Sequence, residues 1–580
     1  MENKKTSSFV RSLCMGEIDE SIITPYPKLQ EAEKETLRSV FDSIGASLKG
    51  RDAEFRKWDR AGELPDSMLE EMKQLGLFSL IVPEEYGGIG MNSSSYSRTL
   101  QELAKYDGSV AITAGAHSSI GMRGLLLFGN EEQKAKYMPK LASGEMIAAF
   151  CLTEPGAGSD ASSIRTKAVK DGNDWILTGE KLWITNGGIA DFFTVFAKTE
   201  GEQGGQMTAF IVTRDMTGLS SGPHEDKMGL RASSTTTVSM DKVRVPANCV
   251  LGEVGKGFKV AMKILNSGRT GLGGGCIGSM KNLISLSTKQ AKERVQFGKP
   301  IADFGLIKQK IGHMVVDCYA TESVVNMVAG LVDQGYEDYA VEAAISKIFA
   351  TECLWRSGDE ALQIAGGNGF MCEFPYERIL RDSRVNRIFE GTNDILRLFV
   401  ALTAMNDVGQ GLKEVSKSVE GIFNDPIKGF GVLSDYARKR ISHATGVGKT
   451  GTTFTKLHPS IKRQAVIFEE ATRDLASAAD RILRKHGKDI INKQFATKRL
   501  ADIMIDLFVL SCVLSRVNSS IEANGVDASS KEIEILNVFS GQARRRIKGN
   551  IGKIDENDDD SIKTLADHAL ENEKYIWDNL

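Results

Sequence analysis

The sequence predicts an α+β fold with an N-terminal helical domain, a central β domain, a C-terminal four-helix bundle and an additional C-terminal helical domain. Apolar residues recur at helical spacing before about residue 150 and after Gly255, and they alternate with period two between these positions. The chain has 580 residues, which at about 100–200 residues per domain suggests several domains. It contains 12 prolines, and so few helix-breaking residues favour long helices.

The composition is that of an ordinary globular protein. Hydrophobic residues make up 41% of the chain, charged residues 26%, and the formal net charge is −3. This balance excludes a wholly disordered, collagenous or membrane-spanning chain, and it lacks the basic excess of a nucleic-acid-binding protein. The eight cysteines form no C-x-x-C pair and the seven histidines no H-E-x-x-H motif, so we expect no metal site.

Scattered cysteines in a large chain are typical of reduced thiols. We therefore expect an intracellular protein; a family resemblance given below implies the cytoplasm in a bacterium, or the mitochondrial matrix or the inner-membrane face in a eukaryote. The N-terminal residues lack the pattern of a signal or transit peptide.

Changes in period divide the chain into five segments. They are an N-terminal extension at 1–29, a helical domain at 30–149, a β domain at 150–256, a helical bundle domain at 257–405 and an additional helical domain at 406–580. The last segment contains a basic loop at 428–463, with eight Lys or Arg residues and one acid. Because basic side chains are attracted to anionic lipid, we expect either peripheral membrane contact or a solvated loop there.

The N-terminal helical domain is predicted from an apolar helical stripe and from a helix-capping motif. Leu69, Met72 and Leu75 recur at helical spacing. Asn130 and Gln133 have the spacing of a capping box at the start of a helix, and Gly144 is suited to end that helix.

The β domain is predicted from alternating runs. Residues 175–187 offer two strand-like runs around a glycine turn, and Asn186-Gly187 is a strong turn signal. Further runs at 193–196, 207–212 and 237–245 continue the alternation, which predicts a β domain of about 110 residues.

Four candidate helices follow in 257–405, which predicts a bundle. Gly273-x-Gly275-x-x-Gly278 has the spacing of a dinucleotide-binding fingerprint, but no strand precedes it. We therefore interpret these glycines as positions of close helix packing.

Three stretches are candidates for chemistry. The glycines of 150–160 either bring backbone N–H groups to a cofactor or form an ordinary turn. Glu390 either complements the dipole of the helix 394–405, which Thr392 or Asn393 would cap, or acts as a carboxylate base. The basic loop 294–299 either meets a pyrophosphate or is solvated.

Six stretches together resemble the acyl-CoA dehydrogenase family, in family order and spacing across residues 30–405. They are 152–160 (LTEPGAGSD), 183–188 (WITNGG), 255–262 (GKGFKVAM), 294–299 (RVQFGK), 363–369 (QIAGGNG) and 388–395 (IFEGTNDI). The tail to residue 580 and the run 398–402 (LFVAL) resemble the very-long-chain branch, which is dimeric and membrane-associated and includes a relative that acts as a respiratory complex I assembly factor.

The resemblance implies an FAD-dependent oxidoreductase that converts long-chain acyl-CoA to trans-2-enoyl-CoA in fatty acid β-oxidation. Glu390 would be the base that removes the α-proton, while the β-hydrogen passes as hydride to flavin N5. Desolvation by the substrate would raise the pKa of Glu390 toward a value suited to this task. The Glu390 N–H and a flavin hydroxyl would hold the thioester oxygen, and the electrons would pass to electron-transfer flavoprotein.

The resemblance also implies the binding residues. The FAD positions are Phe150, Leu152, Thr153, Gly158, Ser159, Trp183, Ile184, Thr185, Arg294, Phe297, Gln363, Ile364, Ala365, Gly366, Gly367, Thr392, Asn393 and Asp394. The substrate positions are Ser159, Gly121, Gly124, Asn266, Arg269 and Gly391. Arg294 would meet the FAD of a second subunit, which implies a homodimer.

Two positions depart from the common pattern of the family. Some relatives place the base on the helix near 266–269, but Gly268 has no side chain and cannot serve. Asn266 stands where many relatives have Asp, a departure that bears on the adenine-side hydrogen bonds of CoA and not on the reaction.

Chain length is argued from a glycine pair. Gly121 and Gly124 lie on one helix face, so they either leave a groove for an acyl tail or allow close helix packing. The resemblance to the very-long-chain branch favours the groove.

Two functional classes remain. The first is a catalytic long-chain acyl-CoA dehydrogenase, and the second is a respiratory-complex assembly scaffold of the same fold in which catalysis is dispensable. An acyl-CoA oxidase is a third option. The intact Glu390 and flavin stretches favour the dehydrogenase.

Overall fold

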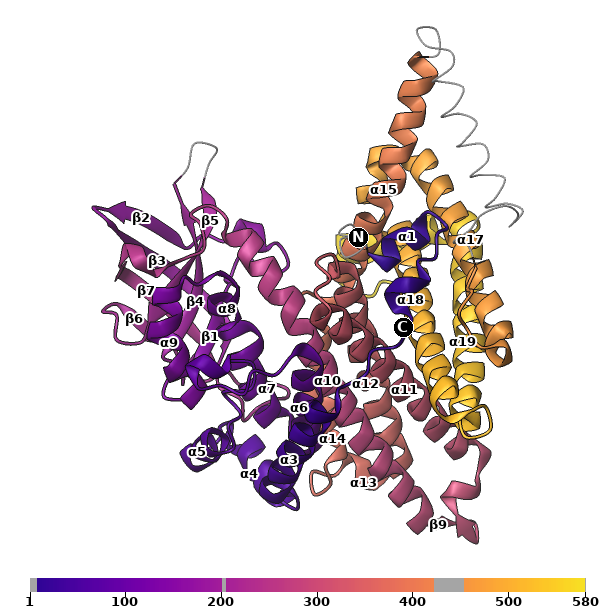
Figure 1. Ribbon diagram of the computed structural model, residues 1–580, viewed down its shortest axis with the longest axis horizontal. Coiled ribbons are helices and arrows are strands. Elements are labelled where there is room, and N and C mark those ends of the chain that lie inside the picture. Colours follow the sequence, from indigo (N-terminus) through magenta and orange to yellow (C-terminus); the bar gives the residue numbers. More distant parts are fainter. Residues whose placement is uncertain (1–7, 201–204, 422–452, 579–580) are drawn as a thin grey trace. The chain divides into compact units, whose positions relative to one another are not determined.

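The computed structural model describes residues 8–200, 205–421 and 453–578. The chain divides into two compact units. We call Pro27–Ile395 the core unit, and Met1–Tyr26 together with Leu396–Leu580 the tail unit. The described elements follow the predicted order of helices, strands and helices (Figure 1).

The core unit begins with the predicted helical domain. Its helices are α3 (Glu31–Leu48), α4 (Asp52–Ala61), α5 (Asp66–Gln74), α6 (Ser93–Tyr106), α7 (Gly108–Gly115), the π-helix η2 (Ala116–Gly121), α8 (Arg123–Phe128) and α9 (Glu131–Ser143). The start of α9 is the predicted capping box, in which Asn130 and Gln133 bond to each other's backbone N–H groups. Its end is Gly144 in the left-handed conformation, as predicted.

The β domain is one mixed eight-stranded sheet with the order β6-β7-β3-β2-β4-β5-β8, and β1 pairs in parallel with β4. The strands are β1 (Ala148–Cys151), β2 (Lys167–Asp171), β3 (Asp174–Thr185), β4 (Phe192–Thr199), β5 (Gln206–Thr213), β6 (Leu219–Ser221), β7 (Thr235–Val245) and β8 (Val250–Leu251). One hydrophobic core runs through this sheet and the preceding helices.

One part of the β prediction is wrong. The two strand-like runs expected around a glycine turn are the single strand β3. Its register against β7 shifts between Leu177 and Gly179, so the glycine marks a bulge and not a turn. The predicted turn at Asn186-Gly187 does follow the end of β3, with Asn186 at φ 64°.

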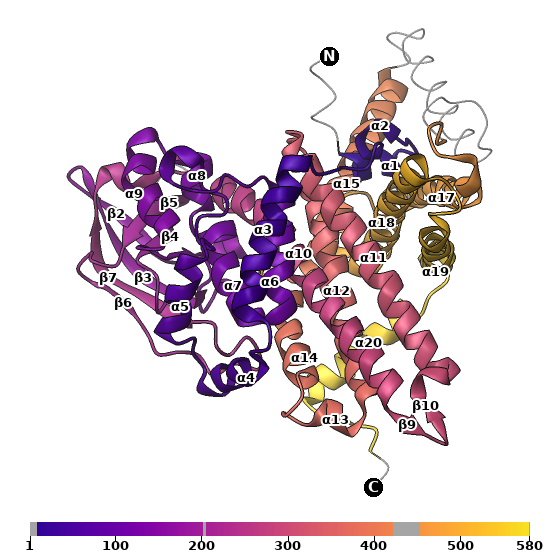
Figure 2. The ribbon, with the colours of Figure 1, turned by 60° about the horizontal axis from the view of Figure 1, so that its bottom comes forward.

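Three long helices form the rest of the core unit and run side by side (Figure 2). They are α10 (Gly257–Glu293), α11 (Gly305–Asp333) and α12 (Ala340–Ala365), followed by the short helices α13 (Gly367–Phe370) and α14 (Tyr376–Arg384). A hairpin of β9 (Val295–Gln296) and β10 (Lys299–Pro300) joins α10 to α11.

The glycines of α10 serve helix packing, as predicted. A Cβ at Gly274 would collide with the backbone oxygen of Ser97 on α6, and one at Gly278 with that of Gln101. The absence of side chains therefore lets α10 approach α6 closely.

In the described part of the chain, α11 has the length and apolar composition of a membrane span. Its 18-residue window has a hydropathy of 1.3, and 78% of that window is buried inside the protein. This is weak support for a span, because the core helix of a globular domain shows the same properties.

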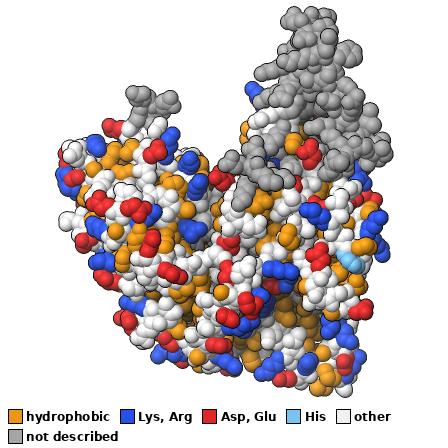
Figure 3. Space-filling view, in the orientation of Figure 1, with side chains coloured by type: hydrophobic (Ala, Val, Ile, Leu, Met, Phe, Trp, Pro, Cys, Tyr) orange, Lys and Arg blue, Asp and Glu red, His pale blue; other side chains and the backbone are white. Residues whose placement is uncertain are grey.

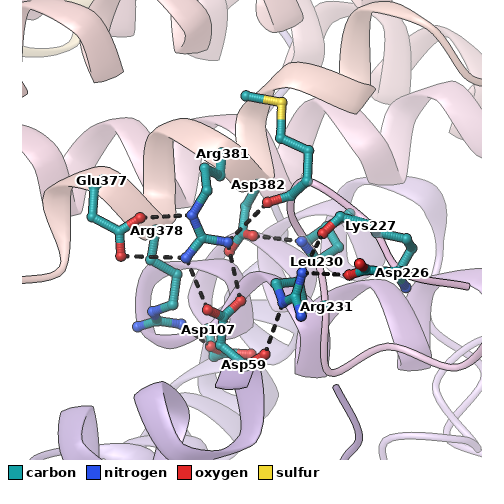
Figure 4. Close-up of polar contacts among 11 residues, drawn as sticks. Asp59, Asp107, Asp226, Lys227, Leu230, Arg231, Glu377, Arg378, Arg381 and Asp382 are labelled. Atoms are coloured by element: carbon teal, nitrogen blue, oxygen red, sulfur yellow. Dashed lines mark hydrogen bonds and ion pairs between the residues drawn. The ribbon is translucent and has the colours of Figure 1, made fainter. Parts of the chain in front are cut away.

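A charged junction connects the three parts of the core unit (Figure 4). Arg381 of α14 donates to Asp59 of α4 at 2.8 Å and to the backbone oxygen of Met228 in the β6–β7 connection at 2.9 Å. Asp382 accepts from the Leu230 N–H at 2.5 Å, and Arg378 pairs with Asp107 at the start of α7. Helical domain, β domain and bundle therefore share one network.

The tail unit is helical. It contains α1 (Phe9–Cys14), α2 (Glu20–Ile23), α17 (Lys462–His486), α18 (Gln494–Asn524), α19 (Ser530–Asp555) and α20 (Asp559–Asn572). Helix α15 (Asn393–Gly421) begins in the core unit and continues into the tail unit.

The N-terminal segment is part of this helical unit and differs from the extension expected at 1–29. The Phe9 ring lies 6.3 Å from that of Phe468 in α17 and 6.1 Å from that of Phe508 in α18. The Glu20 carboxylate accepts from the N–H groups of Thr455 and Lys456. Most of the predicted basic loop, 428–452, lies outside the described residues.

On the face shown in Figure 3, basic and acidic side chains are interspersed among apolar ones. This distribution fits the near-neutral composition of the chain.

Candidate active site

The predicted base lies in a strained turn just before α15. Glu390 has φ 55° and Gly391 has φ 90°, a left-handed backbone region that residues with a side chain avoid. The Thr392 hydroxyl accepts from the Ile395 N–H at 3.2 Å, which confirms one of the two predicted caps of this helix. Glu390 therefore precedes the cap, and the acid in the first turn of the helix is Asp394.

Two buried cations hold this turn. Arg269 of α10 donates through Nη2 to the Glu390 backbone oxygen at 3.3 Å. Lys347 of α12 donates through Nζ to the Gly391 backbone oxygen and to the Asn393 side-chain oxygen, both at 2.9 Å. The exposed fractions of Arg269 and Lys347 are 5% and 0%. Their contacts stabilise a backbone conformation that otherwise costs about 1–3 kcal/mol.

The Glu390 carboxyl group is prepared for proton transfer. Its Oε2 atom is buried and has no hydrogen-bond partner among the described residues. Burial raises the pKa of Glu390 above its ordinary value, while the charges of Arg269 and Lys347 act in the opposite direction. A carboxylate with a raised pKa and a free oxygen is suited to accept a proton from a weak carbon acid.

The absence of a side chain at Gly268 leaves room for this carboxyl group. A Cβ at Gly268 would lie 3.5 Å from Glu390 Oε2 and 3.0 Å from Cγ2 of Ile120 in η2. The helix position where some relatives carry the base is thus beside the Glu390 carboxyl in space.

Asn266 and Arg269 form a pair. The side-chain oxygen of Asn266 accepts from Arg269 Nη1 at 2.6 Å, so Asn266 orients the arginine that holds the Glu390 carbonyl. Burial lowers the pKa of Arg269 to about 10, and the Glu390 charge opposes that change.

The groove predicted at Gly121 and Gly124 is not where the structure leaves space. A Cβ at Gly121 would lie 2.8 Å from atoms of Ala148 in β1. One at Gly124 would lie 2.9 Å from Leu251 Cδ2 and 3.0 Å from Ile264 Cδ1. Protein atoms occupy the volume that the missing side chains leave, so the structure favours the close-packing alternative.

Several predicted flavin positions are open to solvent. An added Cβ would meet no atom within 4 Å at Gly156, Gly158, Gly366 or Gly367. Trp183 is 63% exposed and has φ 57°. Ser159, Gln363 and Asp394 are also exposed, and Thr153, Thr185 and Thr392 are half-buried. Bare backbone at these glycines and an exposed aromatic ring at Trp183 are both suited to the approach of a large planar cofactor.

Other predicted flavin positions are part of the interior. Leu152, Ile184, Ile364 and Ala365 are buried, and the side chain of Phe150 lies 5.1 Å from the Phe196 ring. The side chain of Asn393 is buried and bonded to Lys347 and Thr351.

A buried ion pair supports the loop 152–160. Lys181 of β3 donates to Glu154 Oε1 at 2.7 Å and to the Leu152 backbone oxygen at 3.2 Å. Burial raises the pKa of Glu154, but hydrogen bonds from Lys181 and Thr166 outweigh it, and the pKa lies below its ordinary value. Glu154 is therefore a structural carboxylate.

Arg294 at the end of α10 and Phe297 in the β9–β10 hairpin are both exposed. Phe297 is 93% exposed and has φ 52°. Phe370 at the end of α13 is 74% exposed. Large apolar side chains exposed in this way are typical of an interaction surface.

Sequence reasoning missed Lys347. The signal was present, because this lysine interrupts the otherwise largely apolar run 343–350 of a predicted helix. Helical periodicity does not tell which lysine in a helix points inward. Among the described residues, no group of His, Cys, Asp and Glu side chains could hold a metal ion.

Comparisons with known proteins agree with this arrangement. The descriptions "Acyl-CoA dehydrogenase, N-terminal domain", "middle domain" and "C-terminal domain" match residues 34–145, 149–243 and 255–405. The description "ACAD9/ACADV, C-terminal domain" matches residues 459–575.

Whole-chain relatives were also found. The mitochondrial very long-chain specific acyl-CoA dehydrogenase of Homo sapiens is 42% identical over 559 residues, which cover 95% of this chain and 84% of the human protein. A probable acyl-CoA dehydrogenase of Bacillus subtilis is 37% identical over 83% of this chain and 80% of its own length. The crystal structure of an acyl-CoA dehydrogenase complexed with FAD from Bacillus anthracis matches with a TM-score of 0.80 and 33% identity, over 94% of this chain and 91% of that one.

Proposed function

The chain belongs to the acyl-CoA dehydrogenase family, and from this premise we propose that it oxidises long-chain acyl-CoA thioesters to trans-2-enoyl-CoA with FAD. The observation that carries the catalytic assignment is the buried Glu390 carboxyl, whose Oε2 has no partner among the described residues. An orphaned buried carboxyl oxygen is costly, and a substrate that delivers a proton to it resolves that cost.

The protein's own residues perform the acid–base half of the reaction. Glu390 accepts the α-proton and becomes neutral, which removes its charge from a buried position. Among the described residues, the Glu390 backbone N–H has no acceptor, so we assign it to the thioester oxygen, where it stabilises the developing enolate. FAD, when bound, supplies the acceptor for the hydride that leaves the β-carbon.

The glycines with open space around them support the cofactor assignment. The bare backbones of Gly158, Gly366 and Gly367 let FAD approach closely. Trp183 presents an exposed ring and Thr185 a hydroxyl from the end of β3. The remaining predicted FAD positions keep the roles implied by family resemblance, except that Asn393 acts through the Lys347 network.

A second subunit completes the proposal. The hairpin with Arg294 and Phe297 exposes a cation and an aromatic ring together. A cation is suited to a pyrophosphate, and the aromatic ring is suited to burial against protein. We therefore assign the hairpin to the partner subunit's FAD site in a homodimer, which the predicted role of Arg294 also requires.

We further propose that the electrons pass to electron-transfer flavoprotein and that the protein works inside the cell. All eight cysteines are free thiols, which suits a reducing compartment. The human relative is mitochondrial by its name. A respiratory-complex scaffold would not need the orphaned carboxyl, so the site favours the enzyme.

Anaerobic titration of the FAD-containing protein with acyl-CoAs of 8 to 20 carbons tests the proposal. We expect bleaching of the oxidised flavin absorbance, with the largest effect for long chains. A flavin that stays oxidised with every chain length would contradict the enzyme and support the scaffold.

A further inference from the structure

Lys347 is a buried cation without a buried counterion in contact. Its side chain is 0% exposed, and no carboxylate lies within ion-pair distance of its Nζ atom among the described residues. Burying a charged group without a counterion costs free energy, and a functional role would explain why this lysine is tolerated. Its two acceptors are a backbone carbonyl and an amide oxygen.

Both acceptors lie just after the base in the chain. Gly391 follows Glu390 directly, and its carbonyl is one acceptor at 2.9 Å. Asn393 is the other acceptor at 2.9 Å, and its Nδ2 atom donates to Thr351 Oγ1 at 3.0 Å, one turn along α12 from Lys347. The ammonium therefore ties the left-handed turn to α12, while Arg269 ties the Glu390 carbonyl to α10.

The charges around Lys347 and Glu390 form one coupled set. Burial lowers the pKa of Lys347 to about 7, and the Glu390 charge is the largest influence that raises it. Arg269 and Cys276 from α10 and Glu352 from α12 also face the ammonium. Tyr96 from α6 faces Glu390. Among these groups, Lys347 and Arg269 favour the charged form of Glu390.

We propose that Lys347 is a positioning residue for Glu390. Lys347 fixes the turn through its bonds to Gly391 and Asn393, and its charge keeps the Glu390 carboxyl ionised and able to accept the substrate proton. This inference rests on the proposed role of Glu390 as the base. Arg269 holds the preceding carbonyl, so the two cations clamp consecutive peptide groups from two different helices.

The two functions of the ammonium are separable. Glutamine at position 347 retains an N–H donor without the charge, whereas arginine retains the charge at every accessible pH. If the charge matters, the apparent pKa of the base in the reductive half-reaction should rise from the arginine variant through wild type to the glutamine variant. Removing a nearby positive charge favours the neutral carboxyl, so the glutamine variant should have the highest value.

The test is rapid anaerobic mixing of the FAD-containing protein with a long-chain acyl-CoA across pH, with the rate of flavin bleaching as the readout. We expect Lys347→Gln to move the apparent pKa of the base upward by about one unit and to slow bleaching at neutral pH. Lys347→Arg should keep the apparent pKa at or below the wild-type value. A purely structural role of Lys347 would lower the flavin content and the thermal midpoint of the variants without changing the apparent pKa of the base, so both quantities are measured alongside it.

An apparent pKa that is the same in wild type and both variants overturns the proposal. If one variant does not retain flavin, the apparent pKa of the other variant is compared with that of wild type and tests the proposal in the same way. Failure of the proposed function is distinct, because wild type would then show no bleaching with any acyl-CoA.

Discussion

Glu390 has three properties that a helix-capping acid would not combine. It has a left-handed backbone and an unpartnered carboxyl oxygen, and buried cations hold both its own carbonyl and that of Gly391. The left-handed backbone and the unpartnered oxygen cost free energy in the isolated protein, and the hydrogen bonds from the cations offset part of that cost. The concentration of these properties at one residue is the pattern expected of a site where strain serves chemistry.

We predict that Glu390→Gln retains FAD and still binds acyl-CoA but loses turnover. The amide keeps the shape of the side chain and cannot accept the α-proton, so the rate should fall at least about 10²–10⁴-fold. Stopped-flow measurement of flavin bleaching gives the rate, and a shift of the flavin spectrum on mixing reports binding. Near-normal bleaching would refute Glu390 as the base.

At the scale of single residues, the sequence predicted the helix cap at Thr392 but not the hydrogen bonds of Lys347 that support the turn. Thr392 was one of two predicted caps, because a hydroxyl three residues before a free N–H is a local signal. Lys347 bonds to residues more than 40 positions away, and no local pattern reports such a partner.

At the scale of elements, the roles of glycines were likewise predictable from local sequence only where they did not depend on distant contacts. Those of α10 were predicted to pack against another helix, and the absence of a preceding strand was enough to exclude the alternative. Gly179 was interpreted as a turn because period-two alternation cannot distinguish a bulge from a chain reversal. The packing neighbours of Gly124 come from β8 and α10, so its role depended on tertiary contacts.

We predict that Gly124→Ala destabilises the protein and leaves the chain-length preference unchanged. The new methyl group would press on Leu251 and Ile264, and overpacking of this kind costs about 1–3 kcal/mol. Thermal unfolding and the ratio of kcat/KM for 16-carbon and 8-carbon substrates measure the two effects.

The matched control is Gly275→Ala, whose Cβ would lie at an ordinary 3.7 Å from Ala104 Cβ. A stable Gly124→Ala protein with a preference shifted toward shorter chains would restore the groove interpretation.

For the segment 428–463 we predict salt-sensitive binding to anionic membranes. Its sequence carries eight basic residues and one acid, and each basic residue near an anionic surface adds about 1 kcal/mol. Liposome co-sedimentation should weaken when Arg438, Lys439 and Arg440 are changed to Glu. Equal binding of both proteins, or binding that ignores salt, would favour a solvated loop.

At the scale of the whole molecule, the charged junction decides how the parts of the core unit are joined. Its acids and bases come from α4, α7, α14 and the β6–β7 connection (Figure 4). Periodicity predicts each of these parts, but residues that pair across some 270 or 320 positions leave no local trace. The fold class was therefore predictable, and the connections among its domains were not.

We predict that Asp382→Asn makes the protein more stable relative to wild type as the pH rises. Burial, assisted by the charge of Asp107, raises the pKa of Asp382 from 3.8 to about 7. The stabilising contribution of this raised pKa is complete below about pH 4 and is lost as the pH rises through about 7. Each pKa unit corresponds to about 1.4 kcal/mol.

Thermal unfolding of both proteins from pH 5 to 8 measures the effect, with the exposed Asp226→Asn as the control. A difference in thermal midpoint that stays constant across this range would show that Asp382 does not titrate there.

The contact of Phe9 with Phe508 has a consequence for biosynthesis. Roughly 500 residues separate the two rings, and a ribosome that adds about 5–20 residues per second needs about 25–100 s to produce them. During that interval the apolar side chains of α1 have emerged while α17 and α18 do not yet exist. The tail unit must therefore assemble after translation is nearly complete, and the apolar side chains of α1 lack their packing partners in α17 and α18 until then.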